Sequence, residues 1–174
     1  MRMSNHSPHG PSHARVAVRL LAAVLVLFVG ADHYYEYAVD QYRVLPTIGT
    51  LFLVNFISAT AVGIALLLPL ERLFHRLGGA LTRLAAVSGF GIAATSLIAL
   101  LVSEQTPLFG FMELNYRPAI LVALSSEAAA AAAAAAFLLM TLMASRSRAQ
   151  TPRLRVVGIS AAGGGGTSPR GRAA

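Results

Sequence analysis

Four apolar stretches follow one another along this chain, and each is about as long as a bilayer-spanning helix. They cover roughly residues 16–39, 47–68, 81–102 and 119–143, and polar segments separate them. A helix needs about 20 predominantly apolar residues to cross a hydrocarbon core of about 30 Å. The pattern therefore predicts an all-α protein, built as a four-transmembrane-helix bundle.

The first stretch can cross a bilayer only if its helix continues beyond the apolar residues. Residues 16–31 would extend about 24 Å as a helix, which is shorter than the hydrocarbon core. The helix spans if Arg19 extends its side chain to the surface and the helix runs on to about Val39. No small-residue cleavage motif follows the apolar run, so we expect an uncleaved first helix rather than a signal peptide.

The segments outside the spans are predicted to be short or unstructured. Residues 70–77 alternate apolar and charged side chains at a helical period, which predicts a short cytoplasmic interfacial helix. Residues 1–14 are rich in Ser, Pro, Gly and His, and residues 145–174 are rich in Arg and Gly; both compositions are typical of disordered tails. The transmembrane domain is thus expected to cover residues 15–144.

The arginines predict how the bundle is oriented. All 14 basic residues are arginine, and the formal net charge is +7. Only Arg43 and Arg117 lie on one side of the predicted membrane, and all other arginines lie on the opposite side. The positive-inside rule then predicts a multi-pass protein of the bacterial inner (plasma) membrane with both termini in the cytoplasm. The lipid bilayer accounts for the positive charge, and no nucleic-acid partner is needed.

Several kinds of chemistry have no support in this sequence. Cysteine is absent, which excludes disulfides, thiolate metal sites and cysteine catalysis. The chain contains no Gly-rich phosphate loop, nucleophile elbow or HExxH motif. Intramembrane haem with two histidine ligands is disfavoured because His33 is the one histidine near a span. We therefore expect no cofactor and no resident metal, and a role other than catalysis.

Glu127 is the residue that fits a membrane span least well. It lies about 12 Å along the helix from the start of the fourth span. An ionised carboxylate at such a depth costs on the order of 2.5–3.5 kcal/mol on insertion scales. An ionisable group within a span is a candidate functional residue. The alternative is that Glu127 bonds to Asn55, a serine or a tyrosine and holds helices together.

Three interpretations of the polar residues remain open. The first is an outward-facing pocket that binds a small molecule or a cation, and its candidate residues are Glu127, His33, Glu36, Asn55, Tyr37 and Glu104. The second is a divalent metal site that uses His33 with nearby carboxylates. The third is no site at all, with Asp32, Glu36 and Asp40 sharing one face of a solvated helix end at i, i+4 and i+8.

These interpretations lead to different functions. The first predicts a non-enzymatic membrane protein that binds a small ligand or a protein partner near Glu127. An alternative is a membrane enzyme or proton-linked transporter subunit using Glu127 and His33, which requires both side chains to share a water-accessible cavity. Transport would also require a homo-oligomer or a membrane partner protein, because four short helices form a path alone only with difficulty. A further alternative is a structural or assembly subunit.

Some motifs resemble those of a known group of proteins. The run from Tyr42 to Asn55, with Leu45-Pro46-Thr47-Ile48-Gly49 at its centre, is similar to small uncharacterised four-span membrane proteins of actinobacteria. The segment Leu108–Phe111 and Glu127 also resemble that group. The resemblance covers roughly residues 16–143 and implies the four-span fold but no activity. In the number of its spans alone, the chain also resembles the four-helix DoxX-like membrane proteins.

Overall fold

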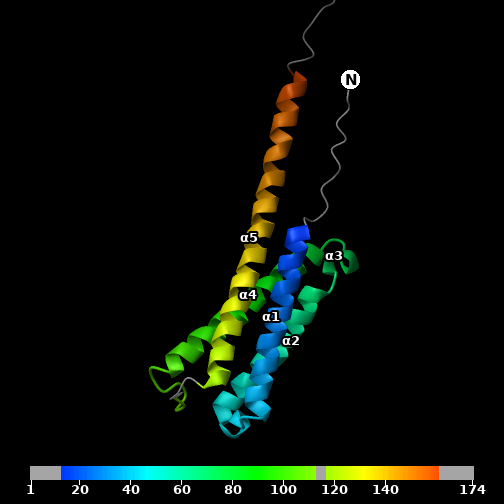
Figure 1. Ribbon diagram of the computed structural model, residues 1–174. Coiled ribbons are helices and arrows are strands. Elements are labelled where there is room, and N and C mark those ends of the chain that lie inside the picture. The colour runs from blue at the N-terminus through cyan, green and yellow to red at the C-terminus, as the bar shows by residue number, and fades with distance from the viewer. Residues whose placement is uncertain (1–12, 113–116, 161–174) are drawn as a thin grey trace, which may run out of the picture. The chain divides into compact units, whose positions relative to one another are not determined.

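A computed structural model describes residues 13–112 and 117–160, and this part of the chain is helical apart from its connections (Figure 1). Its elements are α1 (His13–Ala38), the 3-10 turn η1 (Tyr42–Val44), α2 (Pro46–Leu67), α3 (Leu70–Leu73), α4 (Gly78–Ser103) and α5 (Pro118–Ser160). The described residues contain no β-strand. The predicted all-α fold is confirmed, and α1, α2, α4 and α5 are each long and apolar enough to cross a membrane.

The chain divides into two units, residues 1–140 and 141–174, which we describe separately. The first unit holds α1 to α4 and α5 as far as Met140. In the second unit α5 continues to Ser160, and so extends into the segment 145–174 that was predicted to be a disordered tail. Arg, Ala and Leu in this segment all have high helix propensity. Most of the two predicted tails, residues 1–12 and 161–174, lies outside the described residues.

Helix α1 does run on past its apolar residues, as a spanning length requires. It includes Asp32, His33 and Glu36 and ends at Ala38. Asp40 was predicted to share a helical face with Asp32 and Glu36, but it lies beyond the end of the helix. Its carboxylate instead accepts a hydrogen bond of 3.1 Å from Arg117.

The core of the first unit is built from small residues, while large apolar residues lie on its surface. Most buried apolar residues are alanines, spread over α1, α2, α4 and α5: Ala22, Ala23, Ala59, Ala85, Ala86, Ala93, Ala123, Ala130, Ala133 and Ala134. Exposed residues include Phe28, Val54, Ile98 and Leu139, one from each long helix. Small residues inside and large apolar residues outside are typical of helices that pack in lipid, where close backbone approach rather than water exclusion drives association.

Helices α1 and α2 run side by side through close contacts between small residues (Figure 1). A Cβ atom on Gly30 of α1 would lie 3.2 Å from the Cβ atom of Ala59 of α2. One turn further along α2, a Cβ atom on Gly63 would lie 2.5 Å from Cγ of Leu27 and 3.3 Å from the carbonyl oxygen of Ala23, both in α1. Larger side chains at these two glycines would push the helices apart.

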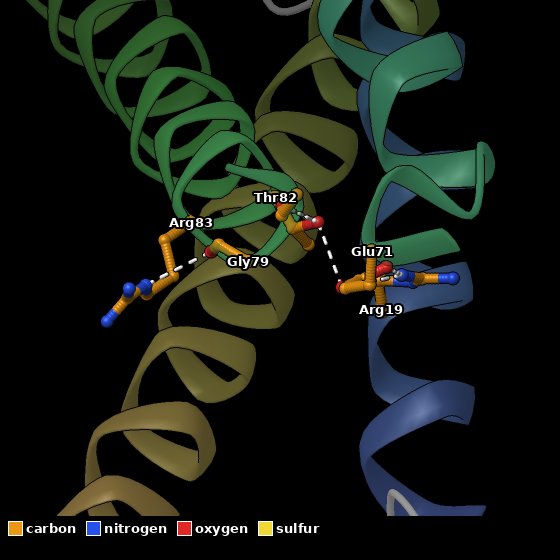
Figure 2. A network of polar contacts seen from close by, with 6 residues as sticks. Arg19, Glu71, Gly79, Thr82 and Arg83 are labelled. Atoms are coloured by element: carbon orange, nitrogen blue, oxygen red, sulfur yellow. Dashed lines mark hydrogen bonds and ion pairs between the residues drawn. The ribbon is translucent and has the colours of Figure 1, made fainter. Parts of the chain in front are cut away.

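A polar network joins α1, α3 and α4 at the end of the bundle where α1 begins (Figure 2). The Arg19 guanidinium lies 3.1 Å from Glu71 Oε2, and the Thr82 hydroxyl donates to Glu71 Oε1 at 2.9 Å. Next to it, Arg83 Nε donates to the Gly79 carbonyl at 3.1 Å. Arg19 was predicted to extend toward the membrane surface, and in the structure its charge is paired with Glu71.

Glu71 is held in its ionised form by this network. Partial burial acts to raise the pKa of the Glu71 carboxyl. Hydrogen bonds from its own backbone N–H and from Thr82, together with the charge and hydrogen bonds of Arg19, outweigh that effect and place the pKa below its ordinary value. Glu71, the one acidic residue of α3, therefore pairs with Arg19 of α1, a helix distant in sequence. The amphipathic pattern around Glu71 did not indicate this pairing.

Candidate functional site

A cavity of about 850 Å³ lies between α2 and α4 and extends along them from Tyr42 of η1 as far as Val62 and Ser88. We call it the α2–α4 cavity. Helices α1 and α5 close one side of it, and most of its lining is apolar. Its volume falls within the range of small-molecule pockets, about 300–1,000 Å³. The polar residues of its α1 and α5 side are Asp32, His33, Glu36 and Glu127.

His33 reaches the cavity because it lies on the packed stripe of α1. Val26, Val29, His33 and Glu36 recur at helical spacing, and all four are buried. His33 Nδ1 lies 2.9 Å from the carbonyl oxygen of Val29, which can only accept a hydrogen bond. Nδ1 therefore carries a proton, and the imidazole presents its other nitrogen, Nε2, to α5.

Glu127 occupies the equivalent place on α5. It follows Ile120 and Ala123 along one stripe of the helix, and only 2% of the residue is exposed. Its Oε1 atom lies 3.7 Å from His33 Nε2, which is an ion-pair distance rather than a hydrogen-bond distance. Its Oε2 atom is buried and has no hydrogen-bond partner among the described residues. A buried carboxylate oxygen without a partner is costly, so it marks a place where a ligand could bind.

A second unsatisfied acceptor comes from α2. Asn55 Nδ2 donates a hydrogen bond to Ser96 Oγ, which links α2 to α4 across the cavity. In this orientation of the amide, the oxygen Asn55 Oδ1 points away from Ser96, and as an amide oxygen it can only accept. Oδ1 is buried and has no hydrogen-bond partner within the described part of the chain. The cavity thus contains two buried oxygen acceptors, one on α2 and one on α5.

Aromatic rings cover the end of the cavity next to η1. The Tyr42 ring stacks on Phe52, with centroids 5.1 Å apart, and meets Phe111 edge-on at 5.3 Å. Arg117 donates a hydrogen bond of 2.8 Å to the Tyr42 hydroxyl, and its guanidinium lies 3.9 Å from Glu36 Oε2. The α4–α5 connection and η1 are therefore joined over the cavity, and Arg117 holds the two together.

The structure brings together four of the six predicted site residues. His33, Glu36, Asn55 and Glu127 all line the cavity, whereas Tyr37 and Glu104 are not among its lining residues. Asp32 also lines it and is therefore more than part of a solvated helix end. Glu127 and His33 line the same cavity, which is one part of what the proton-transfer alternative requires; the other part is access for water.

Sequence reasoning missed Ser96, Tyr42 and Arg117. Ser96 is a polar residue within an apolar run, as Asn55 is, and the same signal could have found it. Arg117 is one of two arginines on the arginine-poor side, but its partners lie far away in sequence and only the fold brings them close.

The metal interpretation gains no support from the geometry. Among residues 13–112 and 117–160, no three His, Asp or Glu side chains are gathered as a metal ion would need.

No protein-family model, no curated protein and no solved structure matches this chain.

Proposed function

We propose that this chain is a multi-pass protein of a bacterial plasma membrane that binds a small amphipathic molecule in the α2–α4 cavity. The observation that carries the proposal is the buried Glu127 carboxylate. It lies beside His33 at the wall of a cavity of about 850 Å³, and one of its oxygens has no hydrogen-bond partner within residues 13–112 and 117–160. Ligand pockets are typically apolar with a few convergent polar groups, and this cavity has that composition.

Gly91 offers a way to fill the cavity without disturbing the helices. It lines the cavity, and a Cβ atom built on it would have no neighbour within 4 Å. A leucine side chain would therefore occupy space that a ligand needs. Gly79 of the same helix also has no neighbour within 4 Å, but it lies outside the cavity lining. Gly79→Leu is thus a matched control for Gly91→Leu.

The experiment compares small molecules that co-purify with three forms of the protein. Wild type, Gly91→Leu and Gly79→Leu are isolated in native lipid particles, extracted, and measured by mass spectrometry. We expect at least one compound to accompany wild type and Gly79→Leu and to fall about tenfold or more in Gly91→Leu. The proposal fails if no compound distinguishes Gly91→Leu from the other two proteins.

Glu127→Gln separates a binding role from a structural or assembly role. If Glu127 holds a ligand, the variant loses the co-purified compound while its unfolding temperature stays near that of wild type. A severe loss of folded protein, with no compound lost from the protein that remains, would instead favour Glu127 as a polar contact between helices.

A second candidate function rests on the pairing of His33 with Glu127. His33 Nε2 and Glu127 Oε1 lie 3.7 Å apart, and a movement of roughly 0.5 Å would bring them within the distance at which a proton is transferred, as a proton-linked transporter or a membrane enzyme would require. Vesicles containing the protein and a pH-sensitive dye test this candidate under an imposed membrane potential. Proton entry should slow in Glu127→Gln and in His33→Gln, and equal rates in all three proteins would dismiss it.

The resemblance to small four-span membrane proteins of actinobacteria adds to the proposal only the expected architecture. The cavity residues and the experiments above do not depend on it.

A further inference from the structure

From the acidic residues on the α1 and α5 side of the α2–α4 cavity we infer that its occupant is a lipid-soluble amine. Its ammonium group binds at Glu127, and its hydrocarbon part lies between α2 and α4. The inference rests on the proposed binding function and adds the chemical class of the ligand.

Two oxygen atoms of cavity-lining residues, Glu127 Oε2 and Asn55 Oδ1, are buried and have no hydrogen-bond partner among the described residues. His33 Nδ1 is committed to the Val29 carbonyl, so Nε2 is the nitrogen that faces Glu127 Oε1, at 3.7 Å. When Glu127 is ionised, its Oε2 atom is an acceptor. Asn55 Oδ1 is an acceptor as well, because Nδ2 donates to Ser96. The complementary head group is therefore a hydrogen-bond donor, such as an amine or an alcohol.

Charge favours an amine over an alcohol. Three carboxylates line the cavity, from Asp32, Glu36 and Glu127, and none of its lining residues in the described part of the chain is an arginine or a lysine. Arg117, which is not a lining residue, pairs with Glu36 and with Asp40, so the charges that the cavity itself presents to a ligand are those of Asp32 and Glu127. A protonated amine would meet these carboxylates with charge-assisted hydrogen bonds, which are about twice as strong as neutral ones. A carboxylate or phosphate head group would be repelled.

The rest of the cavity suits a hydrocarbon chain. Its long walls are mostly apolar, with Val62 and Ile92 among their residues, and the hydroxyl groups of Ser58, Ser88 and Thr95 lie between the apolar positions. The edge of the cavity is open, since Leu51 and Val54 line it and are 47% and 53% exposed. These residues belong to a helix long and apolar enough to span a membrane, so the open edge would face acyl chains. A ligand with an apolar body could enter from the bilayer.

The test uses probes that share one alkyl chain and differ only in the head group. Dodecylamine carrying a diazirine on the last carbon is compared with the matching alcohol, carboxylic acid and trimethylammonium compounds. Each is photolysed with the full-length protein in phosphatidylcholine nanodiscs, and the adducts are mapped by mass spectrometry. We expect the amine to label α2 and α4 along the cavity walls. Labelling by the acid, and by the trimethylammonium compound, which has no N–H donor, should be at least about tenfold weaker than labelling by the amine.

Substitutions of the carboxylates test whether they bind the head group of the probe. Labelling by the amine should fall about tenfold in Glu127→Gln, and also in Asp32→Asn, which keeps the inference testable if the first variant fails to fold. Gly91→Leu should abolish labelling of the cavity walls by every probe, and Gly79→Leu should leave it unchanged.

Three results would overturn the inference in different ways. Equal labelling by amine and acid would leave a binding cavity but refute the head-group class. Stronger labelling by the alcohol than by the amine would retain a donor head group and refute the ammonium. The proposed binding function itself would be refuted by either of two results: the cavity walls of wild type are labelled by none of the probes, or the labelling is the same in Gly91→Leu as in wild type.

Discussion

Glu127 and His33 lower the cost of burying each other in apolar helices. Each would be costly to bury alone, and together they place a carboxylate oxygen 3.7 Å from an imidazole nitrogen whose partner nitrogen is bonded to the Val29 carbonyl. The pair does not satisfy every atom, because Glu127 Oε2 has no partner among the described residues. Buried polar atoms are normally paired, so the remaining oxygen is more informative about function than the pair itself.

Gly49 is a residue whose role depends on backbone contact. A Cβ atom there would lie 2.7 Å from the Tyr42 carbonyl oxygen and 2.8 Å from the Arg43 Cα atom, and neither is the end of a flexible side chain. We expect Gly49→Ala to destabilise the protein by about 1–3 kcal/mol, because η1 must move away from α2. Thermal unfolding in detergent measures the effect. Gly79→Ala, which has open space around it, is the control, and equal stability of the two variants would contradict the prediction.

Glu71 should make stability depend on pH in acid. Its pKa lies below the ordinary value of 4.5, so the ionised group contributes its full stabilisation above pH 4.5. That contribution is lost as the pH falls through the lower pKa of the folded protein. The Glu71 side chain is 48% exposed, so the contribution should be less than about 1 kcal/mol.

Comparing wild type with Glu71→Gln by thermal unfolding tests this pH dependence. The small advantage of wild type should stay constant from neutral pH down to about pH 4.5 and shrink below it. Arg19→Gln, which keeps the Thr82 hydrogen bond to Glu71, should lose only part of the advantage. An advantage that grows as the pH falls would contradict the assignment.

Among the elements, α2 and α4 have an unusual relationship, because a cavity lies between them while a polar contact joins them. Asn55 and Ser96 provide that contact. Leu51 and Val54 line the open edge of this cavity and are about half exposed. The polyalanine run of α5 serves packing on one face, since Ala130, Ala133 and Ala134 are buried while Ala128 and Ala132 are exposed.

The Asn55–Ser96 contact can be measured with a double-mutant cycle. Asn55→Ala, Ser96→Ala and the double variant should show a coupling free energy of about 0.6 kcal/mol, and at most about 1.7 kcal/mol, as for hydrogen bonds between helices in membranes. Unfolding in detergent gives the four stabilities. Ser88 lines the same wall two turns earlier, so coupling between Asn55→Ala and Ser88→Ala should be near zero. Equal coupling for both pairs would show that the contact is not specific.

For the whole molecule, the arginine distribution is the main argument about orientation. The proposed topology places the α4–α5 connection outside the cell and the segment between α3 and α4 in the cytoplasm. Both contain exposed residues, Met112 and Leu77, and the chain has no cysteine of its own.

Single cysteines at these two positions test the orientation. In intact bacterial spheroplasts, a membrane-impermeant maleimide should label Met112→Cys, and it should label Leu77→Cys only after permeabilisation. The opposite labelling pattern would invert the proposed topology, and labelling of both in intact spheroplasts would contradict a bilayer-spanning arrangement of α4.

The helices could be predicted because hydropathy and helical period are properties of local sequence. Runs such as residues 47–68 and 81–102 are apolar over a bilayer's thickness, and the helices found there, α2 and α4, begin and end within three residues of those bounds. Glu127 and Asn55 could be singled out for the same local reason, because a polar residue in an apolar run is visible without any fold.

The partners of these residues depended on the tertiary structure. Whether Glu127 faces His33 or lipid depends on how α1 and α5 rotate about their own axes, and packing of Ala, Gly and Val side chains sets that rotation. The same packing left Tyr37 and Glu104 out of the cavity, brought Arg117 to Asp40 and Arg19 to Glu71, and opened a space between α2 and α4. A void between two helices has no counterpart in either helix's sequence, because it arises from how the two surfaces fail to meet.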